Sequence, residues 1–200
     1  MGNKDNITSL NVANNTVLIN TDNNNVLSYY MTNITNEKKL HTVIKAVEKM
    51  VRTSKKYTAY IRYLKETVGL TTCAVLPNMG GDETNVAVEM HHYPFTLYDI
   101  VKIVIINNMI NKNKFSTYTI AAEVIGLHIN NLVGIVPLTT TIHQLYDVDD
   151  FNISKDMFFG DIMSLISMYR PAITKDMVAK FNKLISKVEN FSIITHKELK

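Results

Sequence analysis

The 200-residue chain contains 46% hydrophobic and 20% charged residues and has a formal net charge of +3. This composition is typical of a globular protein and excludes a fully disordered or collagen-like chain. Its single cysteine, Cys73, excludes an intramolecular disulfide and a zinc site built on cysteine pairs. The longest apolar run, around residues 103–106, is far shorter than the roughly 20 residues of a membrane span. We therefore expect no membrane partner.

Asparagine is concentrated at the N-terminus, because eleven of the 22 asparagines lie in residues 1–36. Asparagine side chains compete for backbone hydrogen bonds and favour turns. Two short apolar pieces, 17–19 and 26–30, are candidate strands. The sequence predicts an arm over residues 1–36, either a partly disordered tail or a β-arm that docks on a partner. A single globular domain follows over residues 37–200.

The first half of this domain is predicted to contain two helices and a hairpin. Asn36 is an expected N-cap, helical periodicity runs from there to Val68, and Ser54 is expected to cap a second helix. Residues 71–76 and 86–91 are β-prone and flank a dense turn signal, which predicts a β-hairpin.

The second half is predicted to be mostly helical. Thr96 and Asp99 form a capping-box pattern at the start of one helix. The fold class is therefore α+β, mainly helical with a small antiparallel β-hairpin. The expected helices cover residues 97–111, 117–129 and 139–146, and two C-terminal helices lie within 155–190, at 161–169 and 175–188; an extended piece is expected at 132–137.

Histidines recur with a distinctive order between residues 91 and 143. His91-His92-Tyr93-Pro94 ends a predicted strand, Asn130-Asn131 follows later, and Ile135-Val136-Pro137-Leu138 precedes His143 at the start of a short helix. This order resembles the HNH, or ββα-metal, nuclease family, and in particular small phage-encoded HNH-like proteins. The resemblance covers about residues 86–147 and implies an HNH-like ββα element.

The resemblance also implies roles for individual residues. His92 would be the general base, and His91 and His143 would ligate a divalent metal. Asn131 (or Asn130) would orient the base or contact the metal. Asp147 stands where three-ligand versions of the family have a further histidine, and its carboxylate suits Mg²⁺. Hydrolysis of a phosphodiester needs such a base and a cation, so the implied cofactor is Mg²⁺, Mn²⁺ or Zn²⁺.

The sequence departs from the family in several places. His92 and Asn131 are 39 residues apart, about twice the usual spacing, and Gly134 occupies the place where the family has its asparagine. Adjacent residues of a flat strand also point to opposite faces. His91 and His92 therefore reach one site only if the strand is twisted or bulged. By contrast, His128 lies on an apolar helix and is expected in the core.

A basic stripe is the second candidate feature. Residues 37–66 contain nine lysines and arginines against three glutamates. Lys45, Lys49, Arg52 and Lys56 are spaced to share one helical face, where they would contact DNA phosphates or form a solvated surface.

Two functions follow from these observations. The leading hypothesis is a metal-dependent, DNA-hydrolysing HNH-like endonuclease of phage type, with DNA as its partner. The alternative is a non-catalytic phage protein, either a structural virion component or a protein that binds a host factor, with a protein partner bound through the N-terminal arm. The expected location is the cytoplasm of an infected bacterial host or the virion.

Overall fold

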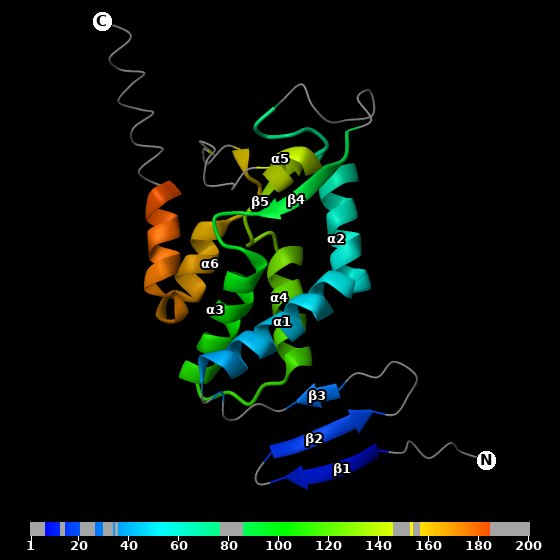
Figure 1. Cartoon of the computed structure of the whole chain (residues 1–200), viewed down its shortest axis with the longest axis vertical. Helices are drawn as coiled ribbons and strands as arrows, with labels where there is room; N and C mark the ends of the chain where they lie inside the picture. Colours follow the sequence, from blue (N-terminus) through cyan, green and yellow to red (C-terminus); the bar gives the residue numbers. More distant parts are fainter. Residues whose placement is uncertain are drawn as a thin grey trace, which may run out of the picture.

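The computed structural model describes residues 7–12, 15–20, 27–29, 34, 36–76, 86–145, 153 and 157–184. Helices pack around an apolar core, and a two-stranded antiparallel sheet lies at one end of the body (Figure 1). The predicted α+β class, mainly helical with a small antiparallel sheet, is confirmed. None of the helices described is long and apolar enough to span a lipid bilayer.

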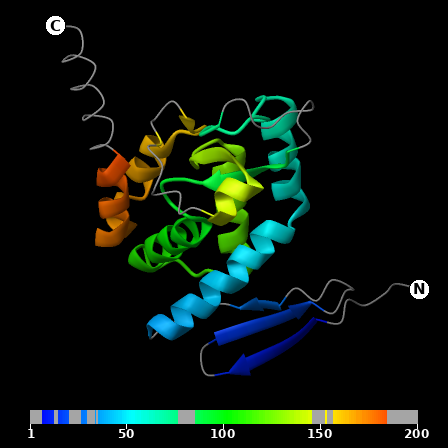
Figure 2. The same cartoon turned by 45° about the horizontal axis from the view of Figure 1, so that its top comes forward.

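Helices α1 (Glu37–Thr53) and α2 (Lys55–Glu66) follow one another with a bend at Ser54 (Figure 2). The Asn36 side chain accepts a hydrogen bond from the Lys39 amide, and Ser54 caps α2 by accepting from the Lys56 amide. Both predicted caps are confirmed. Because Ser54 has extended backbone angles, the basic residues on its two sides lie on two differently directed helices.

Helices α3 (Leu97–Ile110) and α4 (Thr117–Ile129) form the centre of the body. Each begins with a capping box, Thr96 with Asp99 and Ser116 with Thr119, and the first of these was predicted. Lys180 Nζ donates to the Asp99 carboxylate at 2.6 Å, which connects the helix over residues 175–184 to α3. Both central helices are rich in buried aliphatic residues, and both pack against α1 in the main apolar core.

The sheet pairs β4 (Val88–His92) with β5 (Ile135–Thr139) in antiparallel register, with His92 opposite Ile135. The prediction that residues 71–76 pair with β4 in a hairpin is wrong. In that segment, the Ala74 amide instead donates a hydrogen bond to the carbonyl of Pro137, a residue of β5. Helices α3 and α4 are therefore inserted between the two paired strands, and α5 (Thr140–Leu145) continues directly from β5.

The C-terminal part contains α6 (Ile162–Met168), a short 3-10 helix (Arg170–Ala172) and a helix over residues 175–184. These elements agree with the two predicted helices as far as residue 184; the predicted continuation over 185–188 lies outside the described residues.

Near the N-terminus, β1 (Ile7–Val12), β2 (Asn15–Asn20) and β3 (Leu27–Tyr29) form an antiparallel sheet in the order β1-β2-β3. This sheet lies at the end of the molecule opposite β4 and β5 (Figure 1). The strands β2 and β3 occupy the two predicted apolar pieces, whereas β1 was not predicted because its polar residues interrupt the alternation. Whether residues 1–36 act as an arm stays a prediction.

Candidate functional site

Strand β4 sends its two neighbouring histidines to opposite faces of the sheet. His92 is 6% exposed and lies in the interior, whereas His91 is partly exposed. The side-chain alternation of a regular strand produces this division, and the unbroken register between β4 and β5 shows that no bulge relieves it. The structure therefore does not bring His92 together with His91 in one site.

His92 forms a buried pair with His128 of α4, whose side chain is completely buried, as predicted. The two Nε2 atoms are 2.9 Å apart, and His128 Nδ1 lies 2.7 Å from the Val124 carbonyl oxygen. A carbonyl only accepts, so His128 Nδ1 carries the proton and donates to Val124. In neutral His128 the Nε2 atom is then an acceptor, and His92 Nε2 donates to it.

Two tyrosines of α2 enclose this pair. The Tyr57 ring is stacked on His92, with centroids 6.4 Å apart, and meets His128 edge-on at 5.2 Å. Tyr60 contacts His128 edge-on at 5.6 Å. Burial lowers the pKa of His92 well below its ordinary value, and the facing His128 adds to this effect. Burial also lowers the pKa of His128 to about 4. Both rings are thus neutral near pH 7.

The outer face of β4 carries a second group. The rings of His91 and His143 meet edge-on with centroids 4.8 Å apart, and His143 Nδ1 lies 2.8 Å from a Glu89 carboxylate oxygen. His143 and Glu89 are both exposed. The structure thus brings together two of the predicted metal ligands. Even so, within the described ranges no three histidine, cysteine or carboxylate side chains are arranged to hold a metal ion.

The remaining predicted site residues lie elsewhere. Asn131 follows α4 with a left-handed φ of 55°, and its carbonyl accepts from the Asp161 amide at 2.7 Å. Its side-chain oxygen is buried and has no hydrogen-bond partner among the described residues. Asn131 thus shapes the turn after α4. Asp147 lies outside the described residues, so its predicted role as a ligand stays a prediction.

Gly134 explains one departure from the nuclease pattern. The Tyr93 amide donates to the Gly134 carbonyl at 3.0 Å, so the two backbones lie against each other. A Cβ atom added to Gly134 would lie 2.0 Å from the Tyr93 carbonyl oxygen. No side chain fits there, and hence the asparagine of the nuclease family is sterically excluded from this position.

The four basic residues predicted to contact DNA do not form one uniform stripe. Lys45 forms an ion pair with Glu48 at 2.7 Å and lies over the Tyr98 ring at 5.3 Å, so it already has partners within the chain. Lys49 and Arg52 are exposed on α1, and Lys56 lies beyond the bend on α2. Their predicted contact with DNA is not tested by this arrangement.

Comparison with known proteins gives one family. A family model described as "Bacteriophage G278-like virion protein" matches residues 3–198, which is nearly the whole chain. No curated protein and no solved structure is significantly similar to this chain.

Proposed function

Because the chain belongs to the bacteriophage G278-like virion protein family, we propose that it is a non-catalytic structural component of the phage particle. This is the alternative that the sequence offered beside the endonuclease. A phage origin and a virion location follow from the family, whereas the absence of catalysis and the structural role are the proposal. The protein partner predicted for residues 1–36 is part of the same proposal.

The positions of the two histidines of β4 support the proposal. A nuclease of the predicted type needs its general base within hydrogen-bond reach of a water beside the metal. His92 instead donates its Nε2 proton to His128 inside the core, 2.9 Å away. The exposed partner of His91 is His143, which is held by Glu89. The histidines thus serve two separate purposes: one pair joins β4 to α4, and the other joins β4 to α5.

A complementation experiment tests the structural role. A phage lacking this gene is grown in a host that supplies the parent protein, a His91→Ala/His143→Ala double variant, or Gly134→Ala as a control that disturbs the fold. We expect the parent and the histidine variant to restore the same yield of infectious particles, because neither histidine contributes to the core. Gly134→Ala should fail. A histidine variant that enters the particle normally but leaves it non-infectious would contradict the proposal.

A cleavage assay tests the absence of catalysis directly. The purified parent protein is incubated with supercoiled plasmid, single-stranded DNA and branched DNA in Mg²⁺, Mn²⁺ or Zn²⁺. We expect no nicking above the level of the double variant. Metal-dependent nicking by the parent that His143→Ala abolishes would restore the endonuclease hypothesis.

A further inference from the structure

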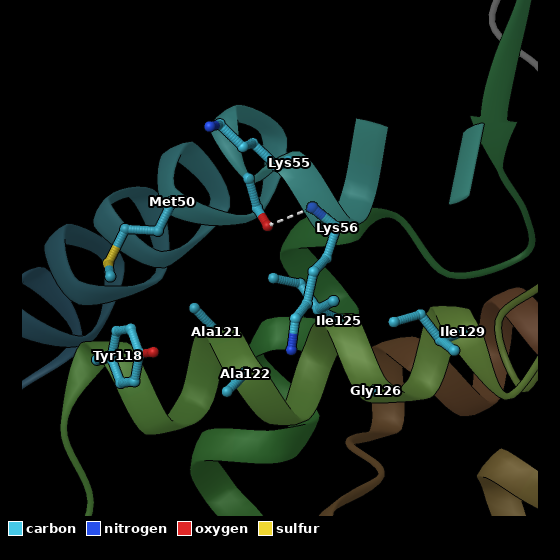
Figure 3. A pocket seen from close by; sticks show the side chains of 10 residues that line it. Met50, Lys55, Lys56, Tyr118, Ala121, Ala122, Ile125, Gly126 and Ile129 are labelled. Carbon is cyan, nitrogen blue, oxygen red and sulfur yellow. Dashed lines mark hydrogen bonds between the residues drawn. The ribbon is translucent and has the colours of Figure 1, made fainter. Parts of the chain in front are cut away.

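A groove runs along the outward side of α4, between this helix and the α1–α2 bend (Figure 3). It consists of two adjoining hollows of about 310 Å³ and about 450 Å³, which share Lys56 and Ile129. Met50 and Tyr118 lie across from each other at one end, and Tyr63 lines the other end. No histidine lines either hollow, although Tyr60, whose ring contacts His128, lines the second one.

The floor of the groove is an apolar helix face that the described part of the chain leaves uncovered. Tyr118, Ala122 and Ile129 follow one another at intervals of four and seven residues, so they lie on one side of α4. Tyr118 is 57% exposed and Ile129 is 51% exposed. An apolar stripe at this spacing is the pattern by which helices pack on one another.

Gly126 lies in the middle of this face, and nothing in the described part of the chain requires a glycine there. Its φ is not in the left-handed region, and a Cβ atom added there would have nothing within 4 Å. Glycine inside a helix costs about 0.5–1 kcal/mol relative to alanine. Within the described structure nothing offsets this cost. The missing side chain does, however, deepen the groove and allows another backbone to approach α4 closely.

The rim of the groove is positively charged. Lys56 reaches across the groove toward α4, whereas Lys55 points away from it (Figure 3). Both lysines lie in the first turn of α2, which contains no acidic residue. Lysines at this end oppose the helix dipole. Among the described carboxylates none forms an ion pair with either lysine. The charge of each lysine is therefore not paired with a carboxylate within the described chain.

We infer that this groove docks an acidic amphipathic helix of another protein of the phage particle, an inference that rests on the proposed structural function. The apolar face of such a helix would cover Tyr118, Ala122 and Ile129, with its backbone closest at Gly126. Its carboxylates would pair with Lys56. Helix-in-groove docking of this kind uses anchors at three- and four-residue spacing.

Two other occupants fit less well. A symmetric contact with a second copy would place the lysines of both chains in one interface, and the lining of the groove contains no carboxylate to pair with them. Duplex DNA would satisfy Lys56 but would leave the apolar floor without a matching surface, since protein–DNA interfaces are polar and strongly basic. The combination of an apolar floor and a basic rim favours the acidic helix.

Photo-crosslinking in intact particles tests which molecule fills the groove. Benzoylphenylalanine is introduced at Tyr118, a conservative change at an exposed aromatic position, and at Met163 of α6 as an exposed control outside the groove. We expect crosslinking at Tyr118 to a segment of a different virion protein that has net negative charge and helical apolar spacing. A crosslink to DNA or to a second copy, the same segment captured from Met163, or no crosslink at Tyr118 would each overturn the inference.

Substitutions in the groove test its chemistry. Lys56→Glu and Gly126→Leu should each reduce the Tyr118 crosslink at least tenfold. Neither should lower the melting temperature, because glutamate suits the first turn of a helix, leucine is a better helix former than glycine, and a Cβ atom at Gly126 meets nothing within 4 Å. The control Lys38→Glu, at an exposed lysine in the first turn of α1, should leave the crosslink unchanged.

The outcomes separate this inference from the proposed function. If Lys56→Glu and Gly126→Leu leave the crosslink at the parental level, the groove is not the docking site, yet the protein can still be a structural component. If the parent protein cleaves DNA, the proposed function fails whatever the groove variants do.

Discussion

His92 and His128 join β4 to α4 through one hydrogen bond, with their Nε2 atoms 2.9 Å apart in the interior. The Val124 carbonyl fixes the direction of this bond, because it takes the Nδ1 proton of His128. His92 is therefore the donor and His128 the acceptor. Two residues 36 positions apart in the sequence thus connect the small sheet to the central helix, and the Nε2 atom of each satisfies that of the other.

Removing both partners of this pair should cost less than the sum of the losses from removing each one alone. His128→Leu leaves the His92 Nε2 proton buried without an acceptor, and an unsatisfied buried donor costs about 1–3 kcal/mol. In the double variant His92→Phe/His128→Leu no polar group is left unpaired. We expect urea unfolding to show a smaller loss for the double variant than the sum of the two single losses. Strictly additive losses would show that the two rings are not coupled.

The same pair should make the folding free energy depend on pH. The folded-state pKa of His128 is lowered from 6.5 to about 4, and that of His92 is lowered as well. Below pH 6.5 these histidines bind protons in the unfolded chain but not in the folded chain. Their contribution to the free energy of unfolding is therefore complete above pH 6.5 and is lost as the pH decreases toward 4. From the pKa of His128 alone the loss reaches about 3 kcal/mol.

Urea unfolding measured from pH 7.5 to pH 4 checks this dependence. The His92→Phe/His128→Leu variant is the control, because it lacks both groups and should show a flatter profile over the same interval. An equally steep decline in the control would assign the pH dependence to carboxylates or other groups instead.

Local sequence patterns predicted where helices α1, α2 and α3 begin. Asn36, Ser54 and Thr96 were identified as caps, and each accepts the expected backbone amide. Capping depends on residues within one turn of each other, so short-range patterns contain the necessary information. The predicted helices over α3 and α4 were correct for the same reason, together with their apolar periodicity.

Strand pairing and the candidate site depended on contacts that local patterns do not specify. Residues 71–76 were β-prone and near β4, yet β4 pairs with β5, more than 40 residues later. The separation of His91 from His92 followed from strand alternation, which the sequence had already raised as an objection to a joint site. The pairing of His92 with His128 became visible only once α4 was placed beneath the sheet.

Glycine substitutions should have opposite effects at two positions. Gly134→Ala would place a Cβ atom 2.0 Å from the Tyr93 carbonyl oxygen, so β4 and β5 would have to separate. We expect it to destabilise the fold by about 3 kcal/mol or more, as other severe backbone clashes do. Gly126→Ala meets nothing within 4 Å and should stabilise α4 by about 0.5–1 kcal/mol. Thermal unfolding of both variants against the parent checks the prediction, and a Gly134→Ala protein with the parental melting temperature would refute the close approach.

Two buried tyrosine hydroxyls should respond differently to removal. The Tyr60 hydroxyl is buried and has no hydrogen-bond partner among the described residues, while the Tyr169 hydroxyl donates to the Glu123 carboxylate at 2.8 Å. Tyr60→Phe removes only an unsatisfied group, so the free energy of unfolding should stay equal or rise. Tyr169→Phe removes a hydrogen bond to a charged acceptor and should cost about 1.5–3 kcal/mol. Both variants keep the aromatic ring, so packing is matched and the comparison isolates the hydroxyls. Urea unfolding at pH 7.5 measures the two free energies, and a larger loss for Tyr60→Phe than for Tyr169→Phe would mean that the Tyr60 hydroxyl has a partner in solution.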